Sequence, residues 1–439
     1  MRPSGQSFNS PTAESGRVFT AGVALRDGTI LELIRLPEQS ALHVWRSGHS
    51  RLVERYKAAG KIYEPMPLDA TVLAAIRLPA GSARYGSVGQ LFDAILGALA
   101  KFSGLPERDL AAATYWVLAS WFPELLPVVP SLIVTSPSAA EARKFLRLLR
   151  CFCRRGVLLT EVSSSGFLAL PRHLRPTLLL EQARIDRRTR GLLRAAAGGT
   201  YVPNSGTFLD LRCACAVSCE QENLDAELDD GALTVSLFAS AVEVPCFDTA
   251  GENKLAAEFQ PQLLRFRCKN FHEIASSTFD APAFSAGVRD LARSLGACIV
   301  GDATLAAGII SLLSVRDSEV RATLATRPDF AVVVVLLALV HERHESRIPV
   351  AMLSGFVNAA LRASGEIKEY SPPEIGRLLT RLSIPRARNA GGMVIDLTRE
   401  VSRRVHELKC RYGMTTSPAS FSSCPDCVAA EAPDSRELV

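Results

Sequence analysis

The spacing of apolar positions changes along the chain, and its first part has the pattern of short strands followed by helices. From residue 17 to about residue 78, short apolar runs are separated by Gly, Asp and Pro, as in β-strands joined by turns; the runs are VFTAGVAL, TILELIRL and TVLAAIRL. Helical spacing follows in GSVGQLFDAILGALAKF and DLAAATYWVLASWF and stops at PELLPVVP. We therefore predict a disordered start over residues 1–16 and a small β-rich module with a helix over residues 17–105.

Strand-like and helix-like segments alternate from Ser131 to about residue 240. SLIVT precedes a helix that begins at Ser138, GVLLTEV precedes SSSGFLALPRHL, and PTLLL precedes RRTRGLLRAAA. Further strand-like runs are TYVP, TFLDLRCACAVS and LTVSLFA. Because buried strands joined by helical crossovers form parallel sheets, the predicted fold class is α/β, with a mostly parallel sheet over residues 106–260.

Helical periodicity dominates the next segment. FSAGVRDLARSLGACIV is expected to form one helix and two more are expected before Arg327, which makes residues 261–328 a helical, lid-like segment. The longest apolar run, FAVVVVLLALV, follows with eleven residues. As a helix it would be about 16 Å long, roughly half the thickness of a bilayer's hydrocarbon core. A buried helix or strand is therefore predicted.

Residues 329–412 have the pattern of a winged helix-turn-helix. Ser371-Pro-Pro-Glu374 combines a serine N-cap, proline at the first helical position and glutamate at the third. Ile375, Leu378, Leu379 and Leu382 follow at helical spacing as one apolar stripe. A helix in VAMLSGFVNAALRAS precedes this segment, a hairpin in RARNAGGMVIDL follows it, and TREVSRRVHELKCRY forms the last helix. Residues 413–439 are predicted to be a disordered tail.

Composition and charge add little to this picture except in one module. The chain has 439 residues, 48% of them apolar and 22% charged, as expected for a soluble protein of two or three domains. Its net charge of +5 does not by itself indicate nucleic-acid binding. Between residues 341 and 412, however, 13 Lys and Arg stand against 8 Asp and Glu, a surplus of 5. With no signal-peptide pattern at the N-terminus, we expect a cytoplasmic protein without membrane contact.

The cysteines and histidines do not predict a metal site. Eleven cysteines without a secretion signal suggest reduced thiols. LRCACAVSC, with Cys213, Cys215 and Cys219, has the alternation of a core strand. CPDC, with Cys424 and Cys427, has no second ligand pair nearby, because only Cys410 and His406 are within reach along the chain. In HERHE, His341 and His344 are interpreted as the solvated end of a helix.

The segment SLIVTSPSAAEARKFLRLLR has the layout of a phosphate-binding loop without its chemistry. On the template GxxxxGK[ST], Ser136 and Glu141 take the glycine positions, Ala142 the lysine and Arg143 the serine or threonine. A carboxylate at Glu141 would repel a triphosphate, and Ala142 cannot reach a phosphate. Lys144 lies two positions beyond the lysine of the template. The same residues also allow an ordinary helix start, because Ser138 to Glu141 is a capping box.

The strand that should carry the catalytic carboxylates is also altered. PTLLLEQ places Glu181 where a Walker B aspartate would stand and Gln182 where the glutamate would stand. Glu181 keeps a carboxylate on a longer arm. Gln182 cannot act as a general base, because an amide cannot take a proton from the attacking water.

The order of these segments resembles the phage- and plasmid-type primase/helicase-associated ATPases. The resemblance covers roughly residues 17–412. It depends on SLIVTSPSAAEARKFLRLLR and RPTLLLEQ, on LLRFRCKNFHEI, on FSAGVRDLARSLGACIVGDATLAAGIISLL and on SPPEIGRLLTRLSIPRARNAGGMVIDL. It implies a P-loop NTPase-like fold with a C-terminal winged helix and work on DNA. Ser136, Glu141, Ala142, Arg143 and Gln182 depart from the family at its catalytic positions, and ELDDGALTVSL has no arginine finger.

The first hypothesis is therefore a pseudo-ATPase that acts as a DNA-associated binding or scaffold protein. It needs neither ATP nor Mg²⁺ and no metal, and it has no catalytic residues. Arg377 and Arg381 would enter the groove of duplex DNA, while Arg386 and Arg388 would meet its phosphates. One alternative is a weak or non-standard ATPase that uses Lys144 or Arg143 as a displaced anchor within a homo-oligomer or beside a partner ATPase. The other is a winged helix used only for protein contacts.

Overall fold

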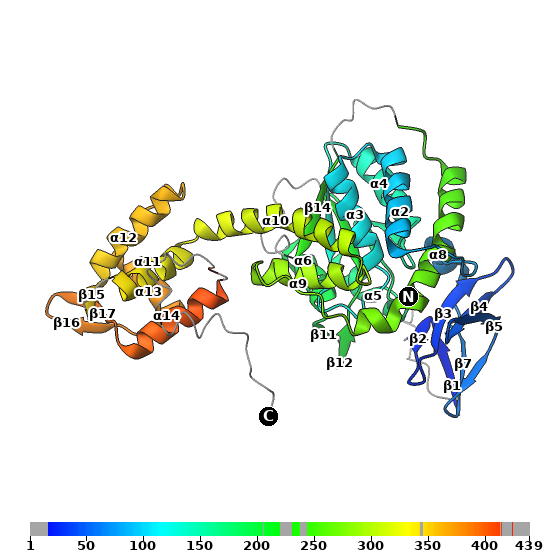
Figure 1. Cartoon of the computed structure of the whole chain (residues 1–439), viewed down its shortest axis with the longest axis horizontal. Helices are drawn as coiled ribbons and strands as arrows, with labels where there is room; N and C mark the ends of the chain where they lie inside the picture. Colours follow the sequence, from blue (N-terminus) through cyan, green and yellow to red (C-terminus); the bar gives the residue numbers. More distant parts are fainter. Residues whose placement is uncertain are drawn as a thin grey trace, which may run out of the picture. The chain divides into compact units, whose positions relative to one another are not determined.

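The computed structural model describes residues 16–204, 206–219, 231–237, 244–342 and 346–412, together with Met414 and Cys424. The two segments predicted to be disordered lie outside the described residues, apart from Gly16, Met414 and Cys424. The chain divides into two compact units (Figure 1). Unit 1 comprises Met1–Asp280 with Asp290–Leu312, and unit 2 comprises Ala281–Arg289 with Leu313–Val439.

Unit 1 begins with the predicted β-rich module, which is present as two small sheets. One sheet has the strand order β2-β3-β4-β5 and is antiparallel throughout, and the other has the order β1-β7-β6. The strands are β1 (Arg17–Thr20), β2 (Gly22–Ala24), β3 (Ile30–Arg35), β4 (Ser40–Arg46), β5 (His49–Val53), β6 (Tyr56–Ala58) and β7 (Lys61–Pro65).

One predicted strand of this module is wrong. The run TVLAAIRL forms a short helix, α1 (Ala70–Ala75), because the Asp69 side chain accepts a hydrogen bond from the Val72 N–H at 2.8 Å and alanine favours the helix. The helical patterns that follow are confirmed as α2 (Val88–Ser103) and α3 (Glu107–Ala119).

The predicted parallel sheet is confirmed as five strands in the order β14-β8-β13-β10-β9, all pairs parallel. The strands are β8 (Ser131–Thr135), β9 (Val157–Thr160), β10 (Leu178–Gln182), β13 (Cys215–Cys219) and β14 (Ala232–Ser236). The described side chains of LRCACAVSC other than Arg212 are buried, as a core strand requires. TYVP and TFLD lie apart from this sheet as the antiparallel hairpin of β11 (Tyr201–Asn204) and β12 (Thr207–Asp210).

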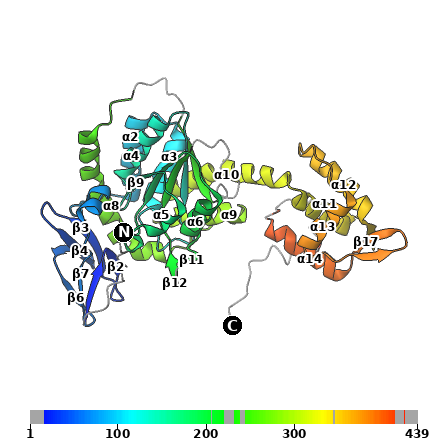
Figure 2. The ribbon, with the colours of Figure 1, turned by 180° about the vertical axis from the view of Figure 1, so that it is seen from behind.

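Helices cover this sheet (Figures 1 and 2). Helix α3 packs against β14 and β8, whereas α4 (Ala139–Arg150) packs against β9, β10 and β13. The other connections are α5 (Ser164–Ala169), the 3-10 turn η1 (Arg172–Leu174) and α6 (Arg187–Gly198). The alternation of strand and helix therefore places the C-terminal ends of β8, β10 and β9 on one edge of the sheet.

The helical segment differs from the prediction in two respects. Helix α8 (Thr249–Ala275) is continuous through Pro261, so the boundary predicted between residues 260 and 261 falls inside a helix. After α9 (Ala286–Ala297), one long helix, α10 (Ala303–Ala325), takes the place of the two that were predicted. The sequence between residues 286 and 327 contains no proline, so nothing ends the helix earlier.

A buried ion cluster ties the β-rich module to the rest of unit 1. Glu32 on β3 accepts hydrogen bonds from Arg154, at 2.9 Å, from Arg155, at 2.7 Å, and from Arg267 of α8, at 2.7 Å. Arg267 also pairs with Glu124. We call these five residues the Glu32 cluster.

Unit 2 contains four helices and a small antiparallel sheet in the order β15-β17-β16 among its residues from 328 to 411. The elements are α11 (Pro328–Glu342), β15 (Arg347–Pro349), α12 (Val350–Ala363), α13 (Pro372–Arg381), β16 (Ala387–Asn389), β17 (Gly392–Asp396) and α14 (Arg399–Arg411). The run FAVVVVLLALV is thus a helix. The predicted hairpin turns at residues 390 and 391, between β16 and β17.

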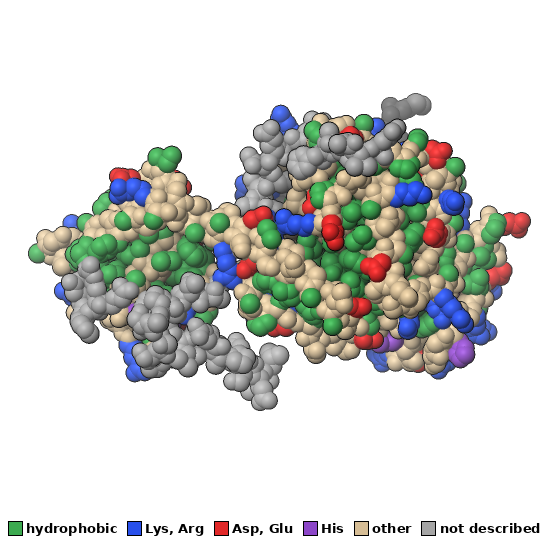
Figure 3. Space-filling view, turned by 45° about the horizontal axis from the view of Figure 1, so that its top comes forward, with side chains coloured by type: hydrophobic (Ala, Val, Ile, Leu, Met, Phe, Trp, Pro, Cys, Tyr) green, Lys and Arg blue, Asp and Glu red, His purple; other side chains and the backbone are tan. Residues whose placement is uncertain are grey.

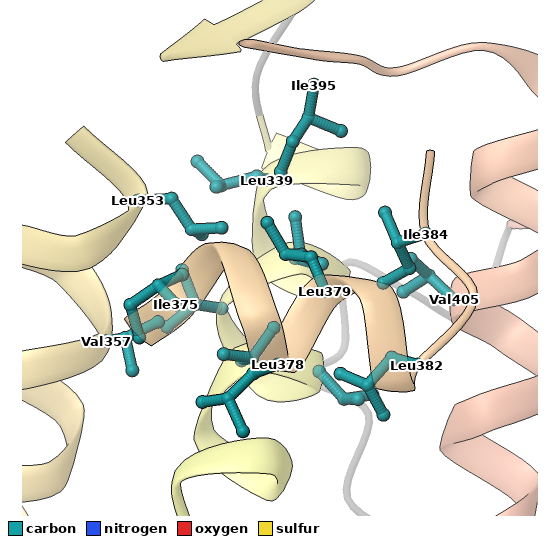
Figure 4. Close-up of a cluster of buried hydrophobic side chains, with 14 of the residues drawn as sticks. Leu339, Leu353, Val357, Ile375, Leu378, Leu379, Leu382, Ile384, Ile395 and Val405 are labelled. Carbon is teal, nitrogen blue, oxygen red and sulfur yellow. The ribbon is translucent and has the colours of Figure 1, made fainter. Parts of the chain in front are cut away.

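The predicted apolar stripe of α13 forms the centre of the unit 2 core (Figure 4). Ile375, Leu378, Leu379 and Leu382 are all buried and pack with Leu339, Leu353, Val357, Ile384, Ile395 and Val405. Each such side chain contributes about 1.5–3 kcal/mol of burial free energy, so this stripe holds α13 against α11, α12 and α14.

Within the described residues, no helix by itself has both the length and the apolar composition that crossing a membrane requires; α10 and α11 meet that test only as a bent pair.

Candidate functional site

The connection between β8 and α4 is too short to surround a phosphate. Only residues 136–138 separate Thr135 from the first helical residue, Ala139. Ser138 is the N-cap and its Oγ accepts from the Glu141 N–H at 3.5 Å. The template positions Glu141, Ala142 and Arg143 therefore lie within the first turns of α4, where their N–H groups belong to the helix.

The capping box predicted at this helix start is formed differently. The Ser138 N–H donates to Ser136 Oγ at 3.2 Å, and Ser136 Oγ donates back to the Ser138 carbonyl at 2.8 Å. Ser136 Oγ thus accepts the hydrogen bond from the Ser138 N–H that was predicted for the Glu141 carboxylate. Glu141 is exposed and Ala142 is buried against the sheet.

Arg143 and Glu181 form a bidentate ion pair across the C-terminal edge of the sheet. Arg143 Nε donates to Glu181 Oε2 at 2.8 Å and Nη2 donates to Oε1 at 2.6 Å. The Arg143 side chain is 55% exposed and that of Glu181 is 12% exposed. Hydrogen bonds from Arg143 lower the pKa of Glu181, and the same bonds raise the pKa of Arg143.

The other predicted residues of this corner are Gln182 and Lys144. Gln182 is buried, with its Nε2 at 3.5 Å from the Val162 carbonyl, and Thr160 Oγ1 lies 3.4 Å from Glu181 Oε2. In the part of the chain that the structure describes, Lys144 makes no ion pair. The structure therefore brings Arg143, Glu181 and Gln182 to one edge and links the first two directly.

The four arginines predicted to contact DNA are all exposed in unit 2. Arg377 and Arg381 lie on α13, and Arg388 lies on β16 opposite Met393. Arg386 folds back onto α13, where its Nη2 donates to Thr380 Oγ1 at 2.7 Å. The structure thus places Arg386 beside α13 and not out on the hairpin.

Arg381 also faces a cavity that the sequence did not reveal. The cavity has a volume of about 460 Å³, and its charged lining residues are Asp329, Arg327, Arg381, Arg404 and Arg411. Four positive charges against one negative give a local surplus of three. Arg404 and Arg411 are seven residues apart on α14, a spacing that puts both on one helix face and that could have revealed them.

Asp329 has a structural role at this cavity. It lies in the first turn of α11, which begins at Pro328. Burial raises the pKa of Asp329, but hydrogen bonds from Arg327 and from the Tyr412 hydroxyl, at 2.6 Å, outweigh it and lower the pKa overall.

On the face drawn in Figure 3, Lys and Arg side chains stand in separate groups among acidic and apolar ones. On this face, any attraction to a polyanion would therefore come from local groups of basic side chains.

The all-parallel five-stranded sheet, with α4 starting directly after its inner strand β8, defines unit 1 as an α/β protein of P-loop-like arrangement. No protein-family model matches the sequence, and no curated protein does.

Several solved structures are similar to the chain at a low level. The apo C-terminal region of NrS-1 is 11% identical, with a TM-score of 0.38 over 84% of this chain and 97% of its own. The SCCmec type IV Cch active helicase is 10% identical, with a TM-score of 0.41 over 90% of this chain and 81% of its own. A full-length MCM homologue from Methanopyrus kandleri is 12% identical, with a TM-score of 0.33 over 65% and 75%. These likenesses are too weak to transfer an activity or a partner.

Proposed function

We propose that this chain is a pseudo-ATPase of P-loop-like fold that acts as a DNA-associated binding or scaffold protein. The observation that carries the first half is the ion pair between Arg143 and Glu181. In P-loop ATPases, the loop serine or threonine and the Walker B aspartate hold Mg²⁺ between them. Here the residues at the two corresponding template positions hold each other, and a guanidinium supplies the positive charge.

Three further features oppose nucleotide chemistry at the same corner. The short β8–α4 connection offers no backbone cradle for a triphosphate. Glu141 adds a negative charge at the helix start, and Gln182 cannot activate water. A metal–nucleotide complex would have to break a bidentate, charge-assisted pair without gaining an anchor in return.

Equilibrium binding of a fluorescent ATP analogue with Mg²⁺ to the full chain tests this half. We expect no saturable binding at millimolar nucleotide. Arg143→Ala should leave the fold unchanged, because the Arg143 end of this pair is solvent-exposed. Micromolar binding that Lys144→Ala abolishes and the exposed control Lys254→Ala preserves would establish the ATPase alternative instead.

The second half of the proposal rests on the elements of unit 2. A helix, a short strand, two further helices and a β-hairpin follow one another in the order of a winged helix, with α13 as the second helix of the helix-turn-helix. Arg377 and Arg381 are exposed on α13, opposite its buried stripe. Such a helix fits the major groove, while arginines beside it fit phosphates.

Fluorescence anisotropy with duplex DNA at several salt concentrations tests the second half. Binding should weaken as salt rises, with a slope of log K against log salt of about −0.9 for each phosphate contact. Arg377→Ala/Arg381→Ala should weaken binding at least tenfold, about 1.4 kcal/mol. The control Arg362→Ala/Arg403→Ala removes the same charge from other exposed positions of unit 2. No binding by the wild type would favour a role in protein contacts only, whereas equal losses in both variants would show that α13 is not the element that contacts DNA.

A further inference from the structure

Two helices of unit 2 present the same combination of arginine and leucine to the cavity of about 460 Å³ that Arg381 faces. The side chains that they contribute to its lining are Leu378, Arg381 and Leu382 of α13 and Arg404, Leu408 and Arg411 of α14. Residues three, four or seven positions apart lie on the same face of a helix. Each helix therefore turns one face that carries both arginine and leucine toward the same space.

The carboxylate of Asp329, the one acidic group among the described residues that line the cavity, already has three donors. Arg327 Nη2 donates to Asp329 Oδ2 at 2.8 Å, and the Tyr412 hydroxyl donates to the same oxygen at 2.6 Å. Arg327 Nε donates to Asp329 Oδ1 at 3.1 Å. Asp329 and Arg327 thus offset each other's charge, and the other three arginines of the lining remain.

These three arginines have few partners among the described residues. Arg404 Nε donates to the Leu382 carbonyl at 3.1 Å, and its Nη1 donates to Glu407 Oε2 at 3.0 Å. Arg381 and Arg411 are exposed, and neither makes an ion pair within the part of the chain that the structure describes. Three positive charges against the one negative charge of Glu407 leave a local surplus of two, which attracts an anionic ligand.

The chemistry of this lining fits the phosphates of a nucleic-acid strand. Every basic group in it is an arginine, whose planar guanidinium can bind a phosphate through two parallel hydrogen bonds. The leucines beside the arginines lower the local dielectric constant, which strengthens such charge-assisted bonds. Arg381 also belongs to the exposed face of α13. A strand that lies along that helix therefore reaches the cavity without leaving the surface of unit 2.

We propose that the DNA backbone passes over this cavity and that Arg404 and Arg411 of α14 bind its phosphates. This inference rests on the proposed DNA-associated function and extends the DNA contact from α13 to a second helix. Phosphate contacts fix the position of a protein on the duplex and do not read its sequence. Arg404 and Arg411 should therefore strengthen the binding of every duplex by the same factor.

Fluorescence anisotropy of the full chain with two duplexes of unrelated sequence, each at several salt concentrations, tests the inference. In Arg404→Gln/Arg411→Gln, the slope of log K against log salt should become less steep by about 1.8, because each lost phosphate contact removes about 0.9. At the lowest salt the affinity should fall at least tenfold, and by the same factor for both duplexes. Arg411→Gln alone should give about half of the change in slope. This single variant keeps the test valid if the double variant does not fold, since Arg404 also bonds to the Leu382 carbonyl.

Arg399→Gln/Arg403→Gln is the matched control. Both arginines are exposed on α14, and at 3.6 residues per turn they lie about 100° or more around the helix from Arg404. The control should keep the wild-type slope. Unchanged slopes in Arg404→Gln/Arg411→Gln, or an equally large change in the control, would overturn the inference and leave the proposed role of α13 intact. A wild type that binds neither duplex would overturn both.

Calorimetric titration with pyrophosphate separates a DNA strand from a free phosphorylated ligand. For a site that binds a DNA strand, we expect no micromolar binding of pyrophosphate, because a strand gains its affinity from many phosphate contacts at once. Micromolar binding of pyrophosphate that Arg404→Gln/Arg411→Gln abolishes, together with unchanged DNA binding in that variant, would assign the cavity to a free ligand and overturn its assignment to DNA.

Discussion

At the scale of single residues, Glu32 depends most on its surroundings. Its side chain is 3% exposed and is contacted by three guanidinium groups. Burial raises the pKa of this carboxyl, but the charges of Arg154, Arg267 and Arg155 outweigh burial and lower it far below its usual range. The carboxylate is therefore charged in the folded protein. Its negative charge offsets part of the positive charge of the three buried arginines.

Glu32→Gln should strongly destabilise unit 1. The substitution keeps the shape but leaves three buried guanidinium groups with one negative charge fewer, which typically costs about 3–5 kcal/mol. Urea unfolding monitored by tryptophan fluorescence measures the loss, since all three tryptophans lie in unit 1. Glu38→Gln, at an exposed position of the same module, should change stability by less than about 0.5 kcal/mol. Equal effects would show that the cluster is not needed.

His43 makes unit 1 sensitive to mild acid. Burial, opposed by the charge of Glu32 and reinforced by that of Arg265, lowers the pKa of this imidazole to about 4. Between about pH 6.5 and pH 4 the unfolded chain therefore binds a proton that the folded chain does not, so stability falls as the pH falls. From pH 7 to pH 5 the loss should be about 2 kcal/mol.

The measurement is the pH dependence of urea unfolding, compared with that of His43→Gln. The glutamine amide can still reach Ser82, whose Oγ lies 2.9 Å from His43 Nε2. The variant should show a smaller slope between pH 7 and pH 5, whatever its absolute stability. Identical slopes would mean that His43 takes up its proton over the same pH range in the folded and the unfolded chain.

None of these residue-level contacts could be predicted from the sequence. Arg154, Arg155 and Arg267 lie 122, 123 and 235 residues from Glu32 along the chain. No periodicity connects positions that far apart, because only tertiary folding brings them together. The same reason explains why the contact between His341 and His406, 65 residues apart, was not foreseen, nor the Arg143–Glu181 pair, 38 residues apart.

At the scale of elements, the start of α13 follows from four residues of sequence. The Glu374 carboxylate accepts hydrogen bonds from both the N–H and the hydroxyl of Ser371 at 2.8 Å, as its capping pattern predicted. These bonds lower the pKa of Glu374, and proline occupies the first turn. Local signals sufficed here because every partner lies within one helical turn.

Ser371→Ala should weaken unit 2 by about 1 kcal/mol, the usual cost of losing an N-cap. Circular dichroism at 222 nm during urea unfolding measures the change. Ser346→Ala, at an exposed serine of the same unit, is the matched control and should change stability by less than about 0.5 kcal/mol. A loss no larger than that of the control would mean that Pro372 and Pro373 start the helix without the cap.

Elements were predicted correctly where one pattern dominated and incorrectly where two competed. The apolar stripe of α13 and the parallel strands have one period each, and both were found. TVLAAIRL has apolar residues that fit either a strand or a helix, and the Asp69 cap decided for the helix. At α4 the capping box was predicted, but the Ser138 N–H donates to Ser136 and not to Glu141. Ser-Pro-Ser also allows a turn in which the two serines hydrogen-bond to each other.

At the scale of the whole molecule, each unit has a core of its own. The Glu32 cluster and the packing around the parallel sheet belong to unit 1. The stripe of α13 and its partners on α11, α12 and α14 belong to unit 2. Chains with two such cores commonly unfold in more than one step, so a single midpoint does not describe them.

We therefore expect calorimetry to resolve two transitions that respond to different substitutions. Glu32→Gln should lower the midpoint of one, and Leu379→Ala, which removes a fully buried side chain of unit 2, should lower that of the other, because a Leu→Ala change in a core costs about 2–5 kcal/mol. In the double variant the two losses should add, since independent sites add within about 0.5 kcal/mol. A single transition that either substitution shifts would mean that the two units fold as one. The corner around Arg143 and Glu181 would then be coupled to α13. A substitution at either place would have to be tested for its effect on stability and binding at the other.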